Sequence, residues 1–348
     1  MVPVQTVTGP VDSGDLGITL FHEHLLNDGK TAWRQPAEDD AEGWEIARGP
    51  IRMEYLGRLR NDPYLSLDNT SLDDIDLAVE EIGRFVAEGG GTVVETTLDG
   101  IGRDPLGLRT ISERSGVRVV MGCGFYLHRT HPPQLMTMSV DDIADAIVHD
   151  VIDGVDGVRA GVIGEIGVSI DFTDAEQRSL RAAARAQRRT GVPLSVHLPG
   201  WLRYGHRVLD IVEEEGANVR ATVLAHMNPT HRDPDYQCSL ADRGAWIEYD
   251  MIGMELLYPG EGQSPSDREN AAAVARLIRD GYAGKLLLSH DVFIKMLLHR
   301  YGGFGYEHIL TGFIPRLERH GVVREVALGL LLDNPRTVFE SAAEGARS

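Results

Sequence analysis

Short apolar runs alternate with longer amphipathic segments along most of the chain. The runs are rich in Val, Ile and Leu and cover residues 18–25, 91–97, 117–126, 160–167, 193–198, 221–227, 245–253 and 285–291. Segments with helical periodicity lie between or after them, at 71–87, 141–152, 174–190, 206–215, 268–280 and 306–320. This alternation is typical of parallel βαβ units, and eight strands close a (β/α)8 barrel. We therefore predict an α/β fold, a TIM barrel that forms one domain over residues 1–348.

Local signals support two of these boundaries, and one segment departs from the rhythm. Thr173 is an expected N-cap with Glu176 as its capping-box partner, and Gly191 followed by Pro193 ends that helix. Residues 27–70 are acidic, carry two tryptophans and show no strong period. Because no second core is evident there, we interpret 27–70 as a long loop after the first strand.

The first apolar run ends in the sequence "LFHEHL", which places two histidines one residue apart. Successive side chains of a strand point to opposite faces, so His22 and His24 share one face and Glu23 takes the other. Two neutral imidazoles on one face make half of a metal site.

Further candidate ligands lie at or near the ends of other predicted strands. They are Glu165, His197, His226 and Asp291. The carboxyl ends of barrel strands converge on one mouth, where barrel enzymes carry their active sites. We therefore predict that six metal-binding side chains meet at that mouth.

Each candidate also has an ordinary interpretation. A lone strand-end histidine such as His197 is more often a hydrogen-bonded polar core residue than a ligand. Glu165 alone could pair with an arginine, although its strand is otherwise apolar and a buried unpaired charge needs a cation nearby. Chance does not explain why all six residues favour the same end of five strands.

Composition excludes several classes of protein. The chain has 42% hydrophobic and 25% charged residues, which is typical of a globular domain. Its formal charge of -19 disfavours nucleic acids and anionic membrane surfaces as partners. The two cysteines, Cys123 and Cys238, form no metal or disulfide spacing, and the first residues lack a signal-peptide pattern, so we expect a cytoplasmic protein.

The ordered set of "HxH", a strand-four acid, two single histidines and "SHD" resembles the phosphotriesterase-like branch of the metal-dependent amidohydrolase superfamily. The resemblance runs from "HEHL" to "DNPRTVF" and includes "YGGFGYEHIL". It implies a barrel that holds two divalent metal ions, for which we expect zinc first, with manganese, cobalt or iron as alternatives. It also implies that His22, His24 and Asp291 hold the more buried ion, while His197 and His226 hold the more exposed one.

The resemblance assigns Glu165 as the ligand that bridges both ions. Many relatives have a carboxylated lysine at this position. Because this chain has a glutamate there, which supplies carboxylate oxygens directly, we expect no modified lysine. Two cations that share a water lower its pKa and polarise the substrate oxygen. Asp291 touches a metal and the bridging water, and we assign it as the catalytic general base. His290 points to the opposite face of its strand and is expected to be structural.

Contacts to the substrate are less constrained by the pattern. Tyr126 follows the third strand and either binds the substrate carbonyl or the bridging water, or packs as a rim aromatic. Arg203 follows the fifth strand, where a guanidinium fork suits a carboxylate, sulfonate or phosphate. Other polar residues just after strand ends are His128, Arg129, His131 and His231.

One departure from the phosphotriesterases proper bears on the substrate. In those enzymes an aspartate after strand six and a histidine after strand seven relay the proton outward. Here Asn228 follows strand six, and no histidine occurs between Arg232 and Ser289. We therefore expect hydrolysis of a small carboxylic ester, lactone or N-acyl amide rather than efficient phosphotriester hydrolysis.

The segment "EYDMIGMELL" resembles the phosphotriesterase-related, or resiniferatoxin-binding, subgroup, some members of which look like amidases for small N-acyl compounds. Two alternatives stay open: a phosphotriester or phosphodiester hydrolase on the same site, and a catalytically silent ligand-binding protein that retains metal. By analogy with relatives we also expect a homodimer, for which Trp33 and Trp44 could supply surface.

Overall fold

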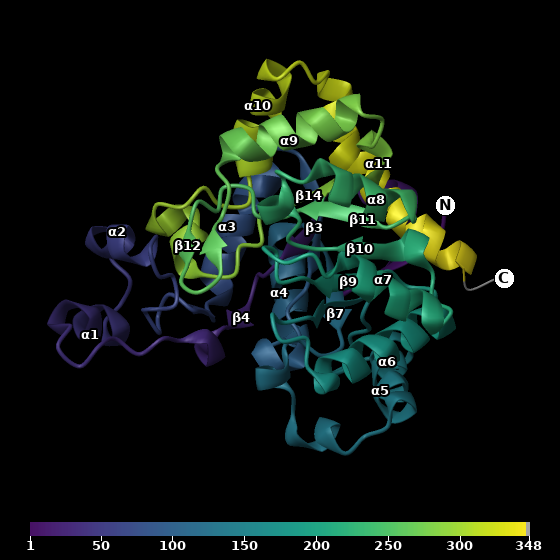
Figure 1. The fold of residues 1–348 in the computed structure, drawn as a ribbon, viewed down its shortest axis with the longest axis horizontal. Helices are drawn as coiled ribbons and strands as arrows, with labels where there is room; N and C mark the ends of the chain where they lie inside the picture. The colour runs from purple at the N-terminus through teal and green to yellow at the C-terminus, as the bar shows by residue number, and fades with distance from the viewer. Residues whose placement is uncertain (346–348) are drawn as a thin grey trace.

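The computed structural model describes residues 1–345, and its centre is a sheet of eight parallel strands. In sheet order the strands are β3 (Ile18–Glu23), β6 (Gly90–Glu95), β7 (Arg118–Cys123), β8 (Val162–Gly167), β9 (Leu194–His197), β10 (Thr222–Leu224), β11 (Trp246–Tyr249) and β14 (Leu286–Leu288). The backbone N–H of Asp291 donates to the His22 carbonyl at 3.2 Å, so the chain after β14 returns to β3. The protein is a TIM barrel, as predicted, although each strand is shorter than its apolar run (Figure 1).

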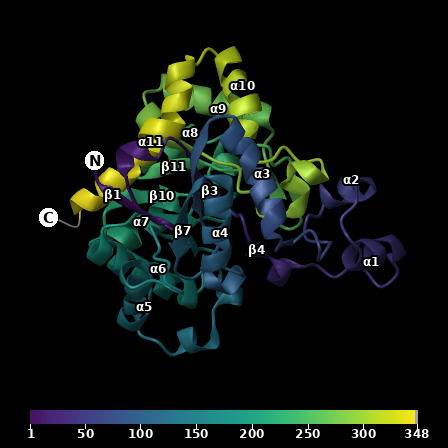
Figure 2. The same cartoon turned by 180° about the vertical axis from the view of Figure 1, so that it is seen from behind.

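Helices surround the barrel in both views (Figures 1 and 2). They are α3 (Ile75–Ala87), α4 (Pro105–Ser115), α5 (Val140–Ile152), α6 (Asp174–Thr190), α7 (Gly205–Glu214), α8 (Pro234–Asp242), α9 (Asp267–Arg279), α10 (Ile314–Arg319) and α11 (Arg324–Gly345). The bounds of α6 match the prediction, and the capping box between Thr173 and Glu176 is present. Periodicity missed α4 and α8, which begin with a proline behind a capping aspartate, and also missed α11.

The helix predicted over 306–320 is wrong at its start. A π-helical turn, Ile309–Phe313, precedes α10, and Pro315 lies in the first turn of that helix. Proline has no backbone N–H, so the regular ladder cannot run through this position. The Tyr306 hydroxyl instead donates to the His24 carbonyl at 2.7 Å, which ties this segment to the end of β3.

The segment between β3 and α3 projects away from the barrel (Figure 1, purple). The prediction of a long loop over residues 27–70 is wrong in part, because this range contains α1 (Ala41–Arg48), α2 (Leu56–Leu59) and β4 (Asn27–Asp28), which pairs with β5 (Ser71–Leu72) just beyond it. The Asp40 carboxylate caps α1, whose Ile46 side chain is buried, and these local contacts explain the helix.

The two tryptophans of this segment pack against each other. The rings of Trp33 and Trp44 lie 6.4 Å apart, and their indole N–H groups donate to the carbonyls of Leu65 and Ala37. These contacts are internal to the segment, so the homodimer stays a prediction.

Apolar side chains close the end of the barrel opposite the mouth. A buried cluster joins Phe21, Val120 and Trp246 to residues of α11, and Phe21 lies 5.5 Å from the Phe339 ring. A hairpin of β1 (Pro3–Thr6) and β2 (Gly9–Asp12) lies near this end, where the Val7 N–H donates to the Val119 carbonyl. The polar groups of the barrel interior are therefore left for the other end. Over residues 1–345, no helix combines the length and apolar character needed to cross a membrane.

Candidate metal centre

The structure brings all six predicted ligands together at the carboxyl ends of the strands. They are His22, His24, Glu165, His197, His226 and Asp291. Three of them lie within strands β3, β8 and β9, while His24, His226 and Asp291 lie just beyond strand ends. All but His197 are buried, so the cluster sits below the mouth.

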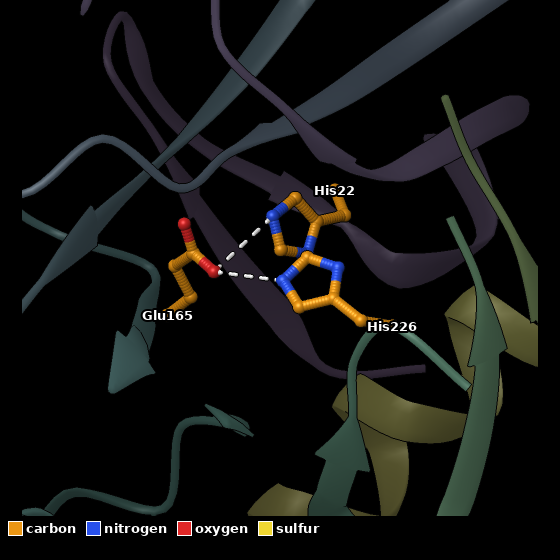
Figure 3. Close-up of side chains that lie close together, drawn as sticks. All are labelled: His22, Glu165 and His226. Carbon is orange, nitrogen blue, oxygen red and sulfur yellow. Dashed lines mark hydrogen bonds and ion pairs between the residues drawn. The ribbon is translucent and has the colours of Figure 1, made fainter. Parts of the chain in front are cut away.

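The Glu165 carboxylate lies at the centre of four imidazoles. Its Oε2 is 2.9 Å from His197 Nδ1, 3.3 Å from His226 Nε2 and 3.6 Å from His22 Nε2. Its Oε1 is 3.5 Å from His24 Nε2. Figure 3 shows one oxygen of Glu165 facing both His22 and His226. A carboxylate in this position can join two sets of imidazole ligands.

Asp291 faces the other side of the first histidine pair. Its Oδ1 lies 3.3 Å from His24 Nε2 and 3.7 Å from His22 Nε2. Asp291 and His226 adopt φ angles of 53° and 58°, in the left-handed region that strains residues with a side chain. Such strain is typical of functional sites and persists where surrounding contacts enforce it.

The cluster fits divalent cations. Both ring nitrogens of His22 are buried and make no hydrogen bond within the described chain, although buried polar atoms normally have a partner. Donor atoms of His22, Glu165 and His226 lie within 4.8 Å of one another, and so do those of His22, His24 and Asp291. Imidazole and carboxylate are the donors that zinc and related metals prefer.

The carboxylates also govern protonation of the imidazoles. Burial would lower the pKa of His24, but Asp291 and Glu165 raise it to about 9. Burial likewise opposes a charged His226, yet its contacts with Asp250 and Glu165 raise its pKa to about 10. A cation that binds here must displace these protons.

Asp250 lies beside the cluster and was not among the predicted site residues. Its Oδ1 lies 3.2 Å from His226 Nδ1, and its Oδ2 lies 3.3 Å from His22 Nδ1. Both oxygens also accept the backbone N–H of His226 at 3.0 Å. One carboxylate therefore orients two candidate ligands that belong to different donor groups.

Glu248 lies two residues before Asp250 and behaves differently. Both Glu248 oxygens are buried and make no hydrogen bond within residues 1–345. Oε2 is 3.7 Å from His22 Nδ1, and burial raises the pKa of Glu248 to about 7. The signal for both residues was visible in the sequence, because acidic positions 248 and 250 alternate within an otherwise apolar run.

The opposite nitrogen of His24 also has a partner. His24 Nδ1 lies 2.8 Å from the Thr97 hydroxyl, which donates to Glu95 Oε1 at 2.6 Å. Burial raises the pKa of Glu95 to about 7. These hydrogen bonds through Thr97 to Glu95 hold the His24 ring with Nε2 facing the cluster.

Comparison with known proteins identifies the family of the chain. Residues 2–339 match the model of the Phosphotriesterase family. The chain belongs to the phosphotriesterase family. N-acetyltaurine hydrolase from Tetraodon nigroviridis is 38% identical over 340 residues, covering 96% of each chain.

Two solved structures show the same fold. A resiniferatoxin-binding protein from Rhodobacter sphaeroides has 53% identity and a TM-score of 0.95, covering 97% of this chain and 94% of that one. The phosphotriesterase homology protein from Escherichia coli, complexed with phosphate, has 26% identity and a TM-score of 0.75, covering 93% and 99%. The predicted resemblance is confirmed, and the chain is a hydrolase.

A cavity that is partly open to solvent lies above the cluster of this phosphotriesterase family member. Its aromatic lining residues include Tyr64, Tyr126, Trp201 and Tyr258. The Tyr126 hydroxyl lies 3.3 Å from His197 Nδ1, so Tyr126 reaches the ligands as well as the cavity.

Arg203 is not among the residues that line this cavity. Its Nε donates to Asp233 at 2.6 Å, and its side chain is half exposed. Arg129, from the loop after β7, lines the cavity instead. The predicted structural role of His290 is confirmed, because its Nδ1 lies 2.8 Å from Glu23 and its Nε2 accepts the Ile309 N–H.

Proposed function

We propose that this protein is a dinuclear metal-dependent hydrolase of small N-acyl amides. The observation that carries the proposal is the Glu165 carboxylate, which lies between two sets of ligands. The reaction class agrees with the family, and the N-acyl amide agrees with the relatives named N-acetyltaurine hydrolase. That the chain carries every ligand is an argument against a catalytically silent binding protein.

The ligands divide into two sets. His22, His24 and Asp291 would hold one ion, His197 and His226 the other, with Glu165 between them. Two bound cations would supply Lewis-acid polarisation of the amide carbonyl and a lower pKa for the attacking water. Zinc is the ion to test first, since this donor set also suits manganese, cobalt and iron.

Two further roles fall to this chain's own side chains. The Asp291 carboxylate lies in the cluster and accepts the proton of the attacking water, then returns it to the departing amine nitrogen. Burial raises the pKa of Tyr126 well above its ordinary value, so its hydroxyl stays a donor near neutral pH. From the cavity wall it can donate to the substrate carbonyl oxygen, where negative charge develops. The products are a carboxylate and a free amine.

The test combines metal analysis with a substrate panel. Purified protein is analysed by elemental mass spectrometry before and after chelation, then assayed on N-acetyltaurine, a nitrophenyl ester, a lactone and a phosphotriester. We expect close to two ions per chain, with amide hydrolysis lost on chelation and restored by zinc. A preference for the phosphotriester, or one ion per chain with full activity, would contradict the proposal.

The Asp291→Asn and Tyr126→Phe variants separate the two roles. Loss of the base lowers kcat by about 10²-fold or more. Loss of the Tyr126 hydroxyl lowers kcat by about tenfold or more while metal content is unchanged. Equal kcat in the wild type and both variants would remove these residues from the mechanism.

A further inference from the structure

The cavity above the candidate metal centre contains one guanidinium group. Apart from the candidate ligands, its charged lining residues are Arg129 and Glu261. No hydrogen bond or ion pair reaches Arg129 from any group within residues 1–345, even though the chain has 53 acidic residues against 34 basic ones. Arg203, which follows the next strand but one, is already paired with Asp233. Arg129 is thus a free cation facing the substrate space.

The backbone that carries Arg129 is fixed. Arg129 is the middle residue of a 3-10 turn, His128–Thr130, and the His128 N–H donates to Glu176 at 3.0 Å. On the other side, His131 Nε2 lies 2.8 Å from the Tyr126 carbonyl. A free side chain on an anchored turn is suited to ligand binding, because little of the turn has to be ordered when the ligand arrives.

The wall of the cavity is aromatic rather than charged. Tyr258 lies 5.6 Å from Trp201 and 6.0 Å from Tyr64, measured between ring centroids. These rings offer apolar surface to a short carbon linker between the amide and a charged end. Arg34 is not among the lining residues, but its guanidinium lies 5.8 Å from the centre of the Tyr64 ring.

The Glu261 carboxylate lies near this positive charge without forming an ion pair with it. Burial raises the pKa of Glu261, and the nearby Arg34 and Arg129 oppose that rise. No ion pair within 4.0 Å joins Glu261 to either arginine among the described residues. The Arg129 guanidinium is therefore available to pair directly with an anion.

We propose that Arg129 binds the anionic end of the substrate's amine half, a sulfonate or carboxylate, and selects acidic N-acyl amides over neutral ones. This inference rests on the proposed function and assigns the substrate class of the same site. A planar guanidinium matches two oxygens of such a group with two parallel hydrogen bonds. The aromatic wall then contacts the linker, and the amide carbonyl reaches Tyr126 at the metal end of the cavity.

The experiment compares Arg129→Ala with Arg203→Ala, a matched arginine outside the cavity lining. The zinc-loaded proteins are assayed on N-acetyltaurine, N-acetyl-β-alanine and the neutral N-propylacetamide. We expect Arg129→Ala to lower kcat/KM for both acidic amides by about 10- to 100-fold, the range of a hydrogen bond to a charged group. Turnover of the neutral amide stays within about twofold in both variants, and Arg203→Ala matches the wild type on all three.

The outcomes separate this inference from the proposed function. If Arg129→Ala has the same ratio of kcat/KM for acidic over neutral amides as the wild type, Arg129 is not a specificity residue, while the amidase assignment stands. If the wild type hydrolyses no amide, the assignment fails, and calorimetric titration with N-acetyltaurine then tests Arg129 alone. Binding that is at least about tenfold weaker in Arg129→Ala supports the anion site. Equal affinity, or no binding to the wild type, overturns it.

Discussion

The two faces of strand β3 carry buried polar groups that differ in how their hydrogen bonds are met. On one face, Glu23 accepts hydrogen bonds from the Ser289 hydroxyl and the N–H groups of His290 and Val292, at 2.8 to 2.9 Å. On the other face, neither ring nitrogen of His22 makes a hydrogen bond within the described chain. Both residues are fully buried.

This contrast distinguishes Glu23, whose hydrogen bonds are made within the fold, from His22, whose nitrogens are available to bind a ligand. A buried carboxylate with every oxygen occupied holds the loop after β14 against β3. A buried imidazole whose nitrogens make no hydrogen bond is costly unless a cation binds them. Substitutions on the Glu23 face should therefore reduce stability, whereas substitutions on the His22 face should reduce metal binding and activity.

The largest effect is expected from Glu165→Gln, because Glu165 lies in the cluster that His22 faces. A neutral amide replaces the carboxylate between the imidazoles, so we expect retained metal to fall below one ion per chain and hydrolysis to fall by about 10³-fold or more. Elemental analysis and kcat/KM measure the two effects, and urea unfolding of the metal-free proteins checks that the variant still folds. Two ions per chain in Glu165→Gln would show that Glu165 is not a bridging ligand.

Glu23→Ala should produce the largest loss of stability. It leaves His290 and two backbone N–H groups buried without an acceptor, and breaking such a network costs about 3–5 kcal/mol in the free energy of unfolding. Glu23→Gln keeps one acceptor oxygen and should cost less. Chemical denaturation of the metal-free proteins gives the values. An unfolding free energy equal to that of the wild type would show that the hydrogen bonds accepted by Glu23 do not stabilise the fold.

Asp250→Asn tests the carboxylate that contacts ligands from both donor groups. An asparagine keeps one acceptor oxygen for the His226 ring but removes the negative charge that lies 3.3 Å from His22 Nδ1, so we expect metal affinity to fall by about 10- to 100-fold. Competition with a chromogenic chelator measures the affinity. Glu248→Gln is the matched control, since Glu248 is buried on the same strand but makes no hydrogen bond within residues 1–345, and its affinity should stay within about threefold. Equal losses in both variants would contradict a specific role for Asp250.

The smallest effect is expected from a buried pair away from the cluster. His308 Nε2 lies 2.6 Å from Asp267 Oδ2, and the Gly253 N–H donates to Asp267 Oδ1. Burial would raise the pKa of Asp267, but these hydrogen bonds lower it below its ordinary value. A lowered pKa in the folded state stabilises the protein above about pH 4, the unfolded value, and this contribution is lost on further acidification.

Unfolding free energies of the wild type and Asp267→Asn between pH 3 and 7 check this sign. The difference between the two proteins should be constant above about pH 5 and shrink below about pH 4. A difference that grows on acidification would mean that Asp267 is not held ionised by His308.

The sequence by itself determined the barrel and the position of the candidate ligands. Short apolar runs predicted eight strands, and chain direction placed their carboxyl ends at one mouth, so the six candidate ligands were expected to lie together there. The capping box of Thr173 and the outward side of His290 also follow from local rules of helix starts and strand alternation. These features depend on neighbours that are close in sequence or on a repeat that covers the whole chain.

Only the tertiary structure decided which further side chains reach the site. Arg203 and Arg129 both follow strand ends, and the choice between them depends on Asp233, which lies 30 positions beyond Arg203 and pairs with it. Asp250 gains its role because its carboxylate lies between His226 and His22, whose strands are far apart in sequence. Loop paths and contacts between distant strands arise from packing of the whole chain, and no local periodicity encodes them.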